Sequence, residues 1–296
     1  MVRSPFFYVG DKYKLVEQFK VVFPDKINRL FEPFCGGGSV FLNIQASKYI
    51  ANDNNTYMIR LHEFLSENSK DEKNFFNNLE SLIEEYGFSA SALGKNVSKE
   101  LKQKYPKTHY AVFNKIQYKK LKNDFNANKN DMMKLYLLLI YGFNHMLRFN
   151  RTGDFNLPVG DVDYNKNVKT AIHNYFEFMK QNEVKFYCED FQNFIANFRF
   201  SSDDLIYFDP PYLISSSEYN KCWTIEEEKR LLKLIDSLNE KGIKFALSNV
   251  FFHKGKENTI LIEWSKKYKV YDIKSNYISY HDNSIKNSKE VLITNF

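Results

Sequence analysis

The residues best suited to chemistry in this 296-residue chain are Asp209, Pro210, Pro211 and Tyr212, which directly follow the apolar run at 205–208. Such a run predicts a buried strand, so the carboxylate stands at a strand end. The two prolines fix φ and stiffen the loop that follows. A stiff loop with a carboxylate and an aromatic ring predicts a site that holds a flat ligand in place.

This loop has the groups needed to activate an amino group on a base. Such a nitrogen is a poor nucleophile because its lone pair is delocalised into the ring. If the Asp209 carboxylate and the Pro210 carbonyl each accept one amino hydrogen, the nitrogen is held toward tetrahedral geometry. Its lone pair then aims at a sulfonium methyl while Tyr212 stacks on the base, which is catalysis by positioning and electrostatics. The alternative is a plain Asp-Pro turn, which we consider the minority interpretation.

A second candidate is the glycine bend at 36–38, which follows the apolar pair Leu30 and Phe31 and the segment 32–35. Glycines let the backbone turn sharply and let a ligand lie against it. In an α/β sheet this turn from strand to helix is where a nucleoside-type ligand sits. No Lys-Ser or Lys-Thr pair follows, so the bend is not a P-loop. On this motif alone, an ordinary tight turn into an apolar helix fits equally well.

The acidic residue Asp53 follows the next apolar run, at 49–51, and lies 17 residues after Gly36. That spacing matches a carboxylate at the end of the second strand, placed to accept from ribose hydroxyls. Asn54 stands beside it. The alternative is a helix cap or turn residue, and the spacing favours the ribose interpretation.

These residues must be positioned by strands that alternate with helices. Apolar runs predict buried strands at 30–31, leading into 32–34, and at 49–51, 184–187, 205–208, 243–247 and 291–294. Helical spacing occurs at 15–23 and at 231–238, where Thr224 and Glu227 have the spacing of an N-terminal cap. The alternation predicts an α/β fold with a mostly parallel sheet covered on both sides.

The alternation breaks between residues 57 and 165, which are rich in lysine and include an apolar, helix-like run at 132–147. We interpret 57–165 as a helical second domain, inserted into a catalytic domain formed by 1–56 and 166–296. The lysines are most simply a solvated face.

Composition narrows the class of protein. Formal net charge is +6, which is compatible with a polyanionic partner without establishing one. Three cysteines without C-x-x-C or zinc-like spacing disfavour disulfides and a metal site. The first ten residues lack the apolar run of a signal peptide, and no stretch is long enough to span a bilayer. We therefore expect a cytoplasmic protein, and a monomer.

Taken together, these motifs resemble the Dam-type (D12 class) DNA adenine methyltransferases over nearly the whole chain. The N-terminal motif of that family resembles residues 8–13, with Tyr8 replacing a usual tryptophan, Asp11 replacing the second glycine and Lys12 matching. Asp190 and Phe191 resemble the motif whose aspartate contacts the cofactor adenine, although a helix cap at Asp190 is an open alternative. The cofactor residues that the resemblance implies are Tyr8, Lys12, Phe34, Gly36, Gly38, Ser39, Val40, Asp53, Asn54, Asp190 and Phe191.

The DNA-recognition stretch of the family resembles residues 142–160. The resemblance implies that Arg148 reads a base edge, as suits a bidentate contact with guanine, that Asn150 supports the loop and that Pro158 lies near the bases. A phosphate contact is the alternative for Arg148. The DNA-binding residues are then Phe143, Asn144, Arg148, Asn150 and Pro158, with Phe143 either intercalating or part of the core. Many relatives have a basic residue where Asp161 stands, so GATC is only a first expectation for the target.

The resemblance implies a Rossmann-like S-adenosylmethionine-dependent methyltransferase sheet, mostly parallel with an antiparallel terminal strand at 289–295, plus a helical DNA-recognition insertion. It implies S-adenosylmethionine as cofactor and double-stranded DNA as partner, with the target adenine flipped out of the helix. The sequence leaves open whether a restriction endonuclease is a further partner.

Cytosine N4 methylation and DNA binding without catalysis are the main alternatives. Cytosine N4 methylation uses the same chemistry, and Asp209 in place of the more usual serine favours adenine. A non-catalytic DNA-binding protein is disfavoured because the Asp209 loop occurs together with the glycine bend. Cytosine C5 methylation needs a cysteine after a proline, whereas Cys35 follows Phe34. Methylation of RNA or of protein amides usually has asparagine in place of Asp209.

Overall fold

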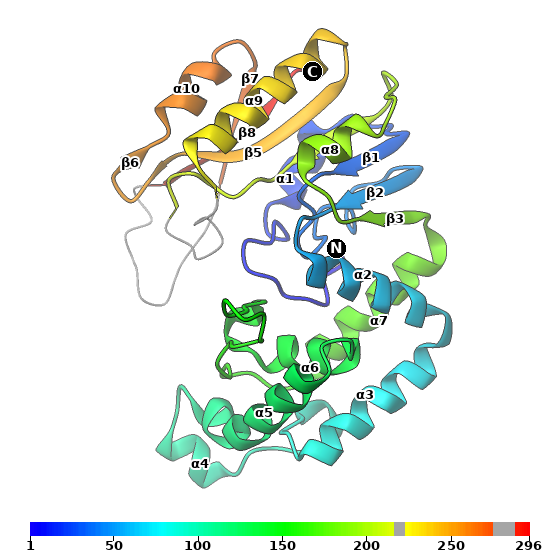
Figure 1. Cartoon of the computed structure of the whole chain (residues 1–296), viewed down its shortest axis with the longest axis vertical. Coiled ribbons are helices and arrows are strands. Elements are labelled where there is room, and N and C mark those ends of the chain that lie inside the picture. The colour runs from blue at the N-terminus through cyan, green and yellow to red at the C-terminus, as the bar shows by residue number, and fades with distance from the viewer. Residues whose placement is uncertain (216–222, 275–287) are drawn as a thin grey trace. The chain divides into compact units, whose positions relative to one another are not determined.

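The computed structural model describes residues 1–215, 223–274 and 288–296, and it divides the chain into two compact units. Unit 1 comprises residues 1–11, 36–42 and 55–182, and unit 2 comprises residues 12–35, 43–54 and 183–296. The sheet belongs to unit 2 and helices α2 to α7 belong to unit 1 (Figure 1).

Unit 2 is built on one sheet with the strand order β3-β2-β1-β4-β5-β8-β7, and the short β6 pairs with β5. The strands are β1 (Arg29–Glu32), β2 (Lys48–Asn52), β3 (Val184–Tyr187), β4 (Leu205–Phe208), β5 (Lys244–His253), β6 (Lys256–Glu257), β7 (Lys269–Ile273) and β8 (Ser288–Thr294). Strands β1 to β5 run parallel to one another, whereas β6 is antiparallel to β5 and β8 is antiparallel to both β5 and β7. The predicted fold class, a mostly parallel α/β sheet with an antiparallel terminal strand, is confirmed.

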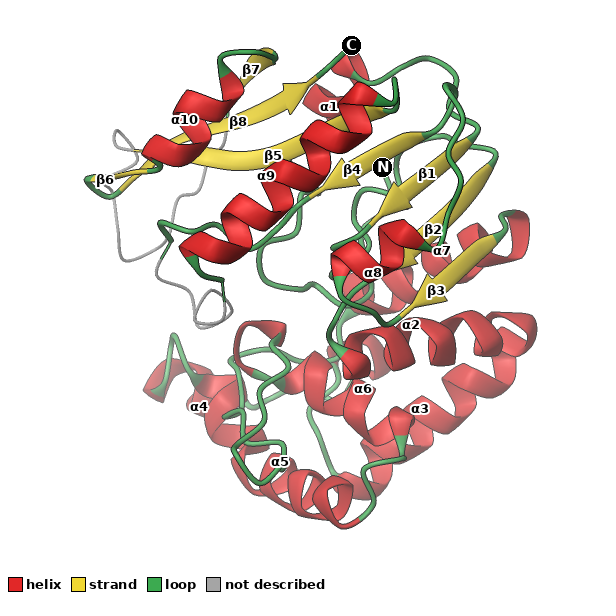
Figure 2. Ribbon diagram, turned by 45° about the horizontal axis from the view of Figure 1, so that its top comes forward, coloured by secondary structure: helices red, strands yellow, loops and turns green. Residues whose placement is uncertain are grey.

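Helices cover both faces of this sheet. Helices α8 (Phe191–Ala196), α9 (Ile225–Glu240) and α10 (Thr259–Ser265) lie on one face, and α1 (Val16–Val22) lies on the other (Figure 2). Thr224 caps α9 by accepting a hydrogen bond from the backbone N–H of Glu227, as the sequence predicted.

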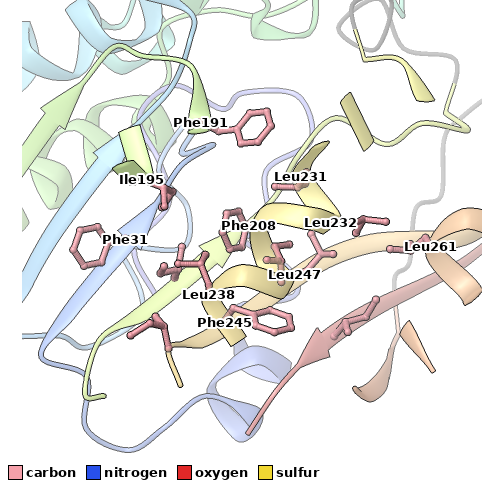
Figure 3. Close-up of a cluster of buried hydrophobic side chains, with 14 of the residues drawn as sticks. Phe31, Phe191, Ile195, Phe208, Leu231, Leu232, Leu238, Phe245, Leu247 and Leu261 are labelled. Carbon is pink, nitrogen blue, oxygen red and sulfur yellow. The ribbon is translucent and has the colours of Figure 1, made fainter. Parts of the chain in front are cut away.

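Alternation along β4 sends its side chains to these two faces. Phe208 packs into the apolar cluster under α8, α9 and α10, together with Phe31 of β1 and Leu247 of β5 (Figure 3). Tyr207 points the opposite way and its ring lies 5.7 Å from that of Phe19 in α1. A strand that is buried on both faces reads as a continuous apolar run, which explains why β4 could be located from the sequence.

The edge of the sheet was harder to predict. The runs at 184–187 and 205–208 coincide with β3 and β4, whereas β5 continues six residues past the predicted end, to His253. Strand β7 was not predicted, because only Ile273 among its residues is buried and no apolar run marks it.

The prediction that the glycine bend leads into a helix was wrong. Residues 39–43 form turns, in which the N–H of Leu42 donates to the carbonyl of Gly38. The apolar residues Val40, Phe41 and Leu42 are buried there, so their apolar character reflects burial in a compact loop.

Unit 1 is mainly helical. Its helices are α2 (Thr56–Asn68), α3 (Glu72–Tyr86), α4 (Lys99–Lys104), α5 (His109–Ala127), α6 (Met132–Tyr141) and α7 (Lys166–Gln181), with 3-10 turns η1 (Ser69–Asp71), η2 (Ser91–Leu93) and η3 (Phe143–His145). Helix α6 is the centre of the unit, since every residue from Leu135 to Tyr141 is buried. Within the described residues no helix combines the length and apolarity needed to cross a membrane.

Unit 1 is larger than the helical domain proposed at 57–165. It also takes in residues 1–11, residues 36–42 and helix α7. The apolar face of α7 explains its place, because the ring of Phe176 lies 5.0 Å from that of Phe75 in α3 and Tyr175 is fully buried. The division into catalytic and target-recognition domains therefore stays a proposal whose boundaries differ from the compact units.

Candidate active site

Four of the predicted site residues follow the carboxyl ends of four adjacent strands of unit 2. Asp190 follows β3, Asp53 follows β2, Phe34 follows β1 and Asp209 follows β4. The chain order of the strands reverses between β1 and β4, and such a switch point is where parallel sheets bind their ligands. The sheet thus brings together at one edge residues that lie far apart in the sequence.

Asn52, which the sequence analysis did not single out, ties three of these strand ends together. Its side-chain amide donates to the carbonyls of Pro33 at 2.9 Å and Glu189 at 3.0 Å, and its Oδ1 accepts from the N–H of Glu189 at 2.9 Å. Asn52 is fully buried and its own carbonyl accepts from the N–H of Cys35. A buried amide with all these bonds made fixes the loops that follow β1 and β3. A buried asparagine that ends an apolar strand was the signal available in the sequence.

At the end of β4, the carboxylate of Asp209 is held by a buried lysine. The Nζ of Lys12 lies 2.8 Å from Oδ2 of Asp209, and the two side chains are 5% and 17% exposed. The resemblance assigned Lys12 to the cofactor, whereas here its ammonium group contacts the proposed catalytic carboxylate. An ion pair with so little exposure fixes the carboxylate in place.

Tyr212 lies beside the same ion pair. Its hydroxyl donates to Oε1 of Glu290 in β8 at 3.0 Å and lies 3.5 Å from Oδ1 of Asp209. The Nζ of Lys12 lies 5.1 Å from the centre of the Tyr212 ring. The hydroxyl and the ring are therefore both held by charged side chains of unit 2. Glu290 was within a predicted strand but had no predicted role.

Three aromatic rings gather beyond β1 and β3. The ring of Phe34 lies 5.3 Å from that of Phe191 and 5.7 Å from that of Trp223, in an edge-on arrangement with the latter. The guanidinium of Arg230 lies over Phe191, 4.3 Å from the ring centre. A group of rings of this kind suits a flat, apolar ligand such as a purine.

Asp190 is both a helix cap and the partner of an arginine. Its Oδ1 accepts from the N–H of Gln192 at the start of α8, and its two oxygens accept from the two terminal nitrogens of Arg230 at 3.1 and 2.6 Å. Burial raises the pKa of Asp190 and is the largest single effect, but the hydrogen bonds and charge of Arg230 together with the hydrogen bonds from the backbone at the start of α8 outweigh it and leave the pKa below its ordinary value. The cap considered as an alternative is present, and the cofactor role stays a prediction.

Asp53 lies in the turn after β2, where its backbone N–H donates to the carbonyl of Tyr187. It is not the residue that caps the following helix, because Asn55 caps α2 by accepting from the N–H groups of Tyr57 and Met58. Asp53 is half-buried and Asn54 is exposed. The Asp53 carboxylate therefore does not cap α2, so the helix-cap interpretation of this residue is excluded.

In unit 1, the glycine bend depends on glycine for both conformation and space. Gly36 and Gly38 have φ of +47° and +76°, which favour glycine, and a Cβ on Gly38 would collide with the ring of Phe41. A Cβ on Gly37 would lie 3.0 Å from the Cβ of Tyr8. The imidazole of His62 lies 2.8 Å from the carbonyl of Gly36 through Nε2. Tyr8 is therefore packed on the bend with which the resemblance groups it.

Ser39 and Val40, two further predicted cofactor residues, are buried within this bend at 6% and 2% exposure. Their side chains therefore have little surface to offer a ligand. If these residues bind the cofactor as predicted, they would do so through their backbone atoms.

The predicted recognition stretch, also in unit 1, begins with an exposed and strained turn. Phe143 is 49% exposed, which excludes the alternative that it belongs to the core. Asn144 and His145 have φ of 53° and 49°, a conformation that costs non-glycine residues free energy. The Nδ1 of His145 lies 3.1 Å from the carbonyl of Leu139. Strain of this kind is retained where the surrounding structure holds a residue in a required place.

The rest of the stretch is a short hairpin, with an isolated bridge between Phe149 and Phe155. Arg148 donates from Nε to Oδ1 of Asn156 at 3.0 Å and from Nη2 to the Asn156 carbonyl at 2.8 Å. Asn150 holds the turn, since its Oδ1 accepts from the N–H groups of Thr152 and Asp154. The guanidinium of Arg148 is thus presented on a fixed loop.

Two residues at the end of the stretch differ in exposure. Pro158 is exposed, and its carbonyl accepts from the N–H of Phe143 at 3.0 Å. Asp161, which directly follows the stretch, accepts through Oδ1 from the N–H groups of Tyr110 and Ala111 at 2.7 and 3.1 Å. Its carboxylate therefore caps the start of α5.

Other reactive groups do not suggest a second chemistry. Burial raises the pKa of the Cys35 thiol well above its usual range, which disfavours it as a nucleophile. Glu72, His173 and Glu177 have ligand atoms within 4.8 Å of one another, the one such group among the described residues. The ammonium of Lys180 already donates to Glu72 at 3.2 Å and Glu177 at 2.8 Å, so these carboxylates are compensated without a metal ion.

Comparison with known proteins identifies a family for the chain. Residues 8–279 match the family model described as D12 class N6 adenine-specific DNA methyltransferase. The matched region contains the glycine bend, the recognition stretch and the Asp209 loop.

Among curated proteins, the chain is 37% identical to type II methyltransferase M.FokI of Planomicrobium okeanokoites and 34% identical to modification methylase StsI of Streptococcus sanguinis. In both comparisons the whole chain is covered, but only 43% of the relative. It is 28% identical to the DNA adenine methylase of Escherichia coli K12, covering 90% of this chain and 85% of that protein. The chain therefore spans less than half the length of the first two relatives.

Proposed function

Because the chain belongs to the D12 class of N6 adenine-specific DNA methyltransferases, we propose that it methylates the exocyclic amino nitrogen of adenine in double-stranded DNA. The methyl donor proposed is S-adenosylmethionine. The observation that carries this proposal is the end of β4, where a buried lysine holds the Asp209 carboxylate beside Tyr212.

In the proposed reaction, the protein holds the amino group in a reactive geometry. The Asp209 carboxylate accepts one amino hydrogen and the Pro210 carbonyl accepts the other, which frees the nitrogen lone pair from the ring. S-adenosylmethionine, when bound, supplies an electrophilic methyl group on a sulfonium. When the nitrogen takes the methyl group, the methyl–sulfur bond would break and its electron pair would stay on the sulfur of the departing S-adenosylhomocysteine. Asp209 would stabilise the positive charge that develops on the nitrogen, and one amino proton would then be lost to solvent. Lys12 keeps the carboxylate oriented throughout.

The residues around the strand ends suit the donor chemically. A ribose presents two hydroxyl donors, which match the carboxylate of Asp53. A purine ring matches the aromatic pair Phe34 and Phe191, whose rings lie 5.3 Å apart, and its amino group matches Asp190. Gly36, Gly38, Ser39 and Val40 are assigned to the donor by the likeness to the family alone.

We propose that the recognition stretch contacts DNA. A flipped adenine leaves a gap in the base stack, and the exposed ring of Phe143 suits insertion into it. Asn144 and Pro158 lie at the same exposed turn, and Arg148 is the candidate reader of a base edge. GATC is our working target, although Asp161 is engaged in capping α5.

M.FokI and StsI bear the names of a type II methyltransferase and a modification methylase, so we include a cognate restriction endonuclease as a proposed partner. We propose that the protein acts as a monomer in the cytoplasm.

The central test is the substitution Asp209→Ala. We expect it to lower methylation by roughly 100-fold or more, the loss typical when one group that stabilises transition-state charge is removed. Methylated adenines would be detected by sequencing DNA from a methylation-free host that carries the cloned gene. Binding of S-adenosylhomocysteine, measured by calorimetry, should be largely retained.

Asp203→Ala provides a matched control, because Asp203 is an exposed acid six residues earlier in the chain. It should leave methylation unchanged. Full activity of Asp209→Ala would end the proposed role of this carboxylate. Absence of modified bases with the unaltered chain would end the proposed function itself.

A further inference from the structure

Glu290 is a charged residue at the start of the buried part of strand β8, after two exposed residues. Its carboxylate is 2% exposed, and the next three residues, Val291 to Ile293, are completely buried. A buried carboxylate is unfavourable relative to an apolar side chain unless specific partners hold it. Departures of this kind from local sequence preference are most often found where a residue serves a site.

The position of Glu290 in the sheet directs it toward the Asp209 loop. Glu290 is paired with Val250 of β5 and Ile273 of β7, and alternation places it on the face opposite to Val291 and Ile293, which lie in the cluster under α9. From there its Oε1 accepts the hydroxyl proton of Tyr212 at 3.0 Å. The carboxylate on the last strand thus contacts the last residue of the catalytic motif.

The hydroxyl of Tyr212 is the one group through which a carboxylate can fix this ring. A tyrosine ring turns about two bonds, and a hydrogen bond at its far end restricts both. The hydroxyl also lies 3.5 Å from Oδ1 of Asp209, and the ring lies 5.1 Å from the Lys12 ammonium. Glu290 therefore restrains the ring from the side of the sheet, while Lys12 restrains it from the N-terminal segment.

We propose that Glu290 is a positioning residue, which holds the Tyr212 ring in the plane needed to stack on the extruded target base. This inference rests on the proposed function, since it assumes that a base is bound beside Tyr212. A ring held in advance stabilises the extruded base without the entropy loss of ordering the side chain at each turnover. The effect should appear in steps that involve DNA and be absent from cofactor binding.

The first experiment compares two substitutions at this position in the full chain. Glu290→Leu removes the acceptor and should lower kcat for a duplex that carries the target by roughly tenfold or more, because small misplacements of positioning groups are costly. Glu290→Gln keeps an oxygen acceptor of the same reach and should stay within about threefold of the parent. The affinity for S-adenosylhomocysteine should be unchanged in both. Asp272→Asn, at an exposed acid on the neighbouring strand β7, is the control.

A double-mutant cycle with Tyr212→Phe separates positioning from a general effect on folding. If Glu290 acts through the hydroxyl, Tyr212→Phe should lower kcat by a similar factor, and Glu290→Leu should cause little further loss in that background. Fluorescence of 2-aminopurine at the target position should show less base extrusion in both single variants. Losses that multiply in the double variant, or an unchanged extrusion signal, would overturn the inference.

The outcomes distinguish this inference from the proposed function. If the parent chain methylates no DNA, the function fails and the cycle has no baseline. If the parent is active and Glu290→Leu matches it, only the positioning role fails. If Glu290→Leu does not fold, the cycle is run with Glu290→Gln, and a large loss at an unchanged Tm would show that charge rather than an acceptor is required, which also contradicts the proposal.

Discussion

Individual buried polar side chains determine the geometry of the candidate site. Lys12 holds the carboxylate of Asp209 at 2.8 Å, and Asn52 joins the loops that follow β1 and β3 through three hydrogen bonds. Each is 4% exposed or less, so its bonds are protected from competition by water. The parts of the site in unit 2 are therefore preorganised before any ligand is bound.

His62 has the corresponding role for the glycine bend in unit 1. Its Nε2 contacts the carbonyl of Gly36, which can only accept, so Nε2 carries the proton and Nδ1 accepts from the hydroxyl of Tyr175 at 2.9 Å. The ring is fully buried, and burial lowers its pKa from 6.5 to about 4, against the smaller opposing effect of the bond to Gly36. The imidazole is therefore neutral in the folded protein at neutral pH.

This depressed pKa predicts acid sensitivity. Between pH 6.5 and about 4 the unfolded chain binds a proton at His62 that the folded chain does not, so stability is complete above this window and falls as the pH falls through it. The loss from this residue should approach roughly 3 kcal/mol in the free energy of unfolding. Urea unfolding of the parent and of His62→Gln across this range measures it. The variant should show a flatter dependence on pH, and parallel curves would contradict the prediction.

The sequence predicted those site residues whose signal is local. Asp209 stands directly after an apolar run and Asp53 two residues after one, and each directly follows a strand in the structure. Glu290 and the bond from Lys12 to Asp209 could not be predicted, because the two ends of each contact are far apart in the chain and only the sheet brings them together. Burial of a single carboxylate leaves no trace in local spacing.

Among the elements, the glycine bend illustrates how burial can imitate helical propensity. The apolar residues after it predicted a helix, yet they form turns that bury Val40, Phe41 and Leu42. Strand β7 shows the opposite failure, since its residues are mostly exposed and the sequence showed no strand there. Periodicity reports a buried face, and it is uninformative when an element is wholly buried or mostly exposed.

The hairpin that carries Arg148 yields a prediction about this element. Replacing Arg148 by alanine should relax sequence preference at one base pair, lowering discrimination by roughly 1–3 kcal/mol, the range for a bidentate contact to a base. Asn156→Ala removes the two-point support of the guanidinium only in part, because the backbone carbonyl remains, and should relax preference less. Competition between duplexes that differ at single positions is the measurement.

Arg151 offers a matched control for this experiment. It is an exposed arginine on the same hairpin, three residues away, so Arg151→Ala removes an equal charge. Arg151→Ala should weaken DNA binding equally for all sequences and should leave the sequence preference unchanged. If Arg148→Ala behaves in the same even manner, Arg148 is a phosphate contact, which is the alternative that the sequence left open.

At the scale of the whole molecule, neither unit is one continuous stretch of chain. The chain passes from one unit to the other at residues 11–12, 35–36, 42–43, 54–55 and 182–183. A change in composition along the sequence located only the long helical insertion, and it placed the end of that insertion before α7. The shorter crossings carry no change in composition, and they are defined only by which residues pack together.

If S-adenosylmethionine binds as proposed, its product should stabilise the folded chain. A ligand at 100 times its Kd contributes about 2.7 kcal/mol, which for a protein of this size corresponds to a rise in Tm of roughly 4 °C. Asp53→Ala should weaken this affinity by roughly 10- to 100-fold, because it removes an ionised acceptor of ribose hydroxyls, and the rise should shrink accordingly. Asp25→Ala, at an exposed acid of the same unit, should preserve the full rise in Tm.

Scanning calorimetry with increasing S-adenosylhomocysteine compares the parent with the two variants. A full rise in Asp53→Ala would reduce that carboxylate to a turn residue, whereas no rise in the parent at saturating ligand would favour a DNA-binding protein without catalysis.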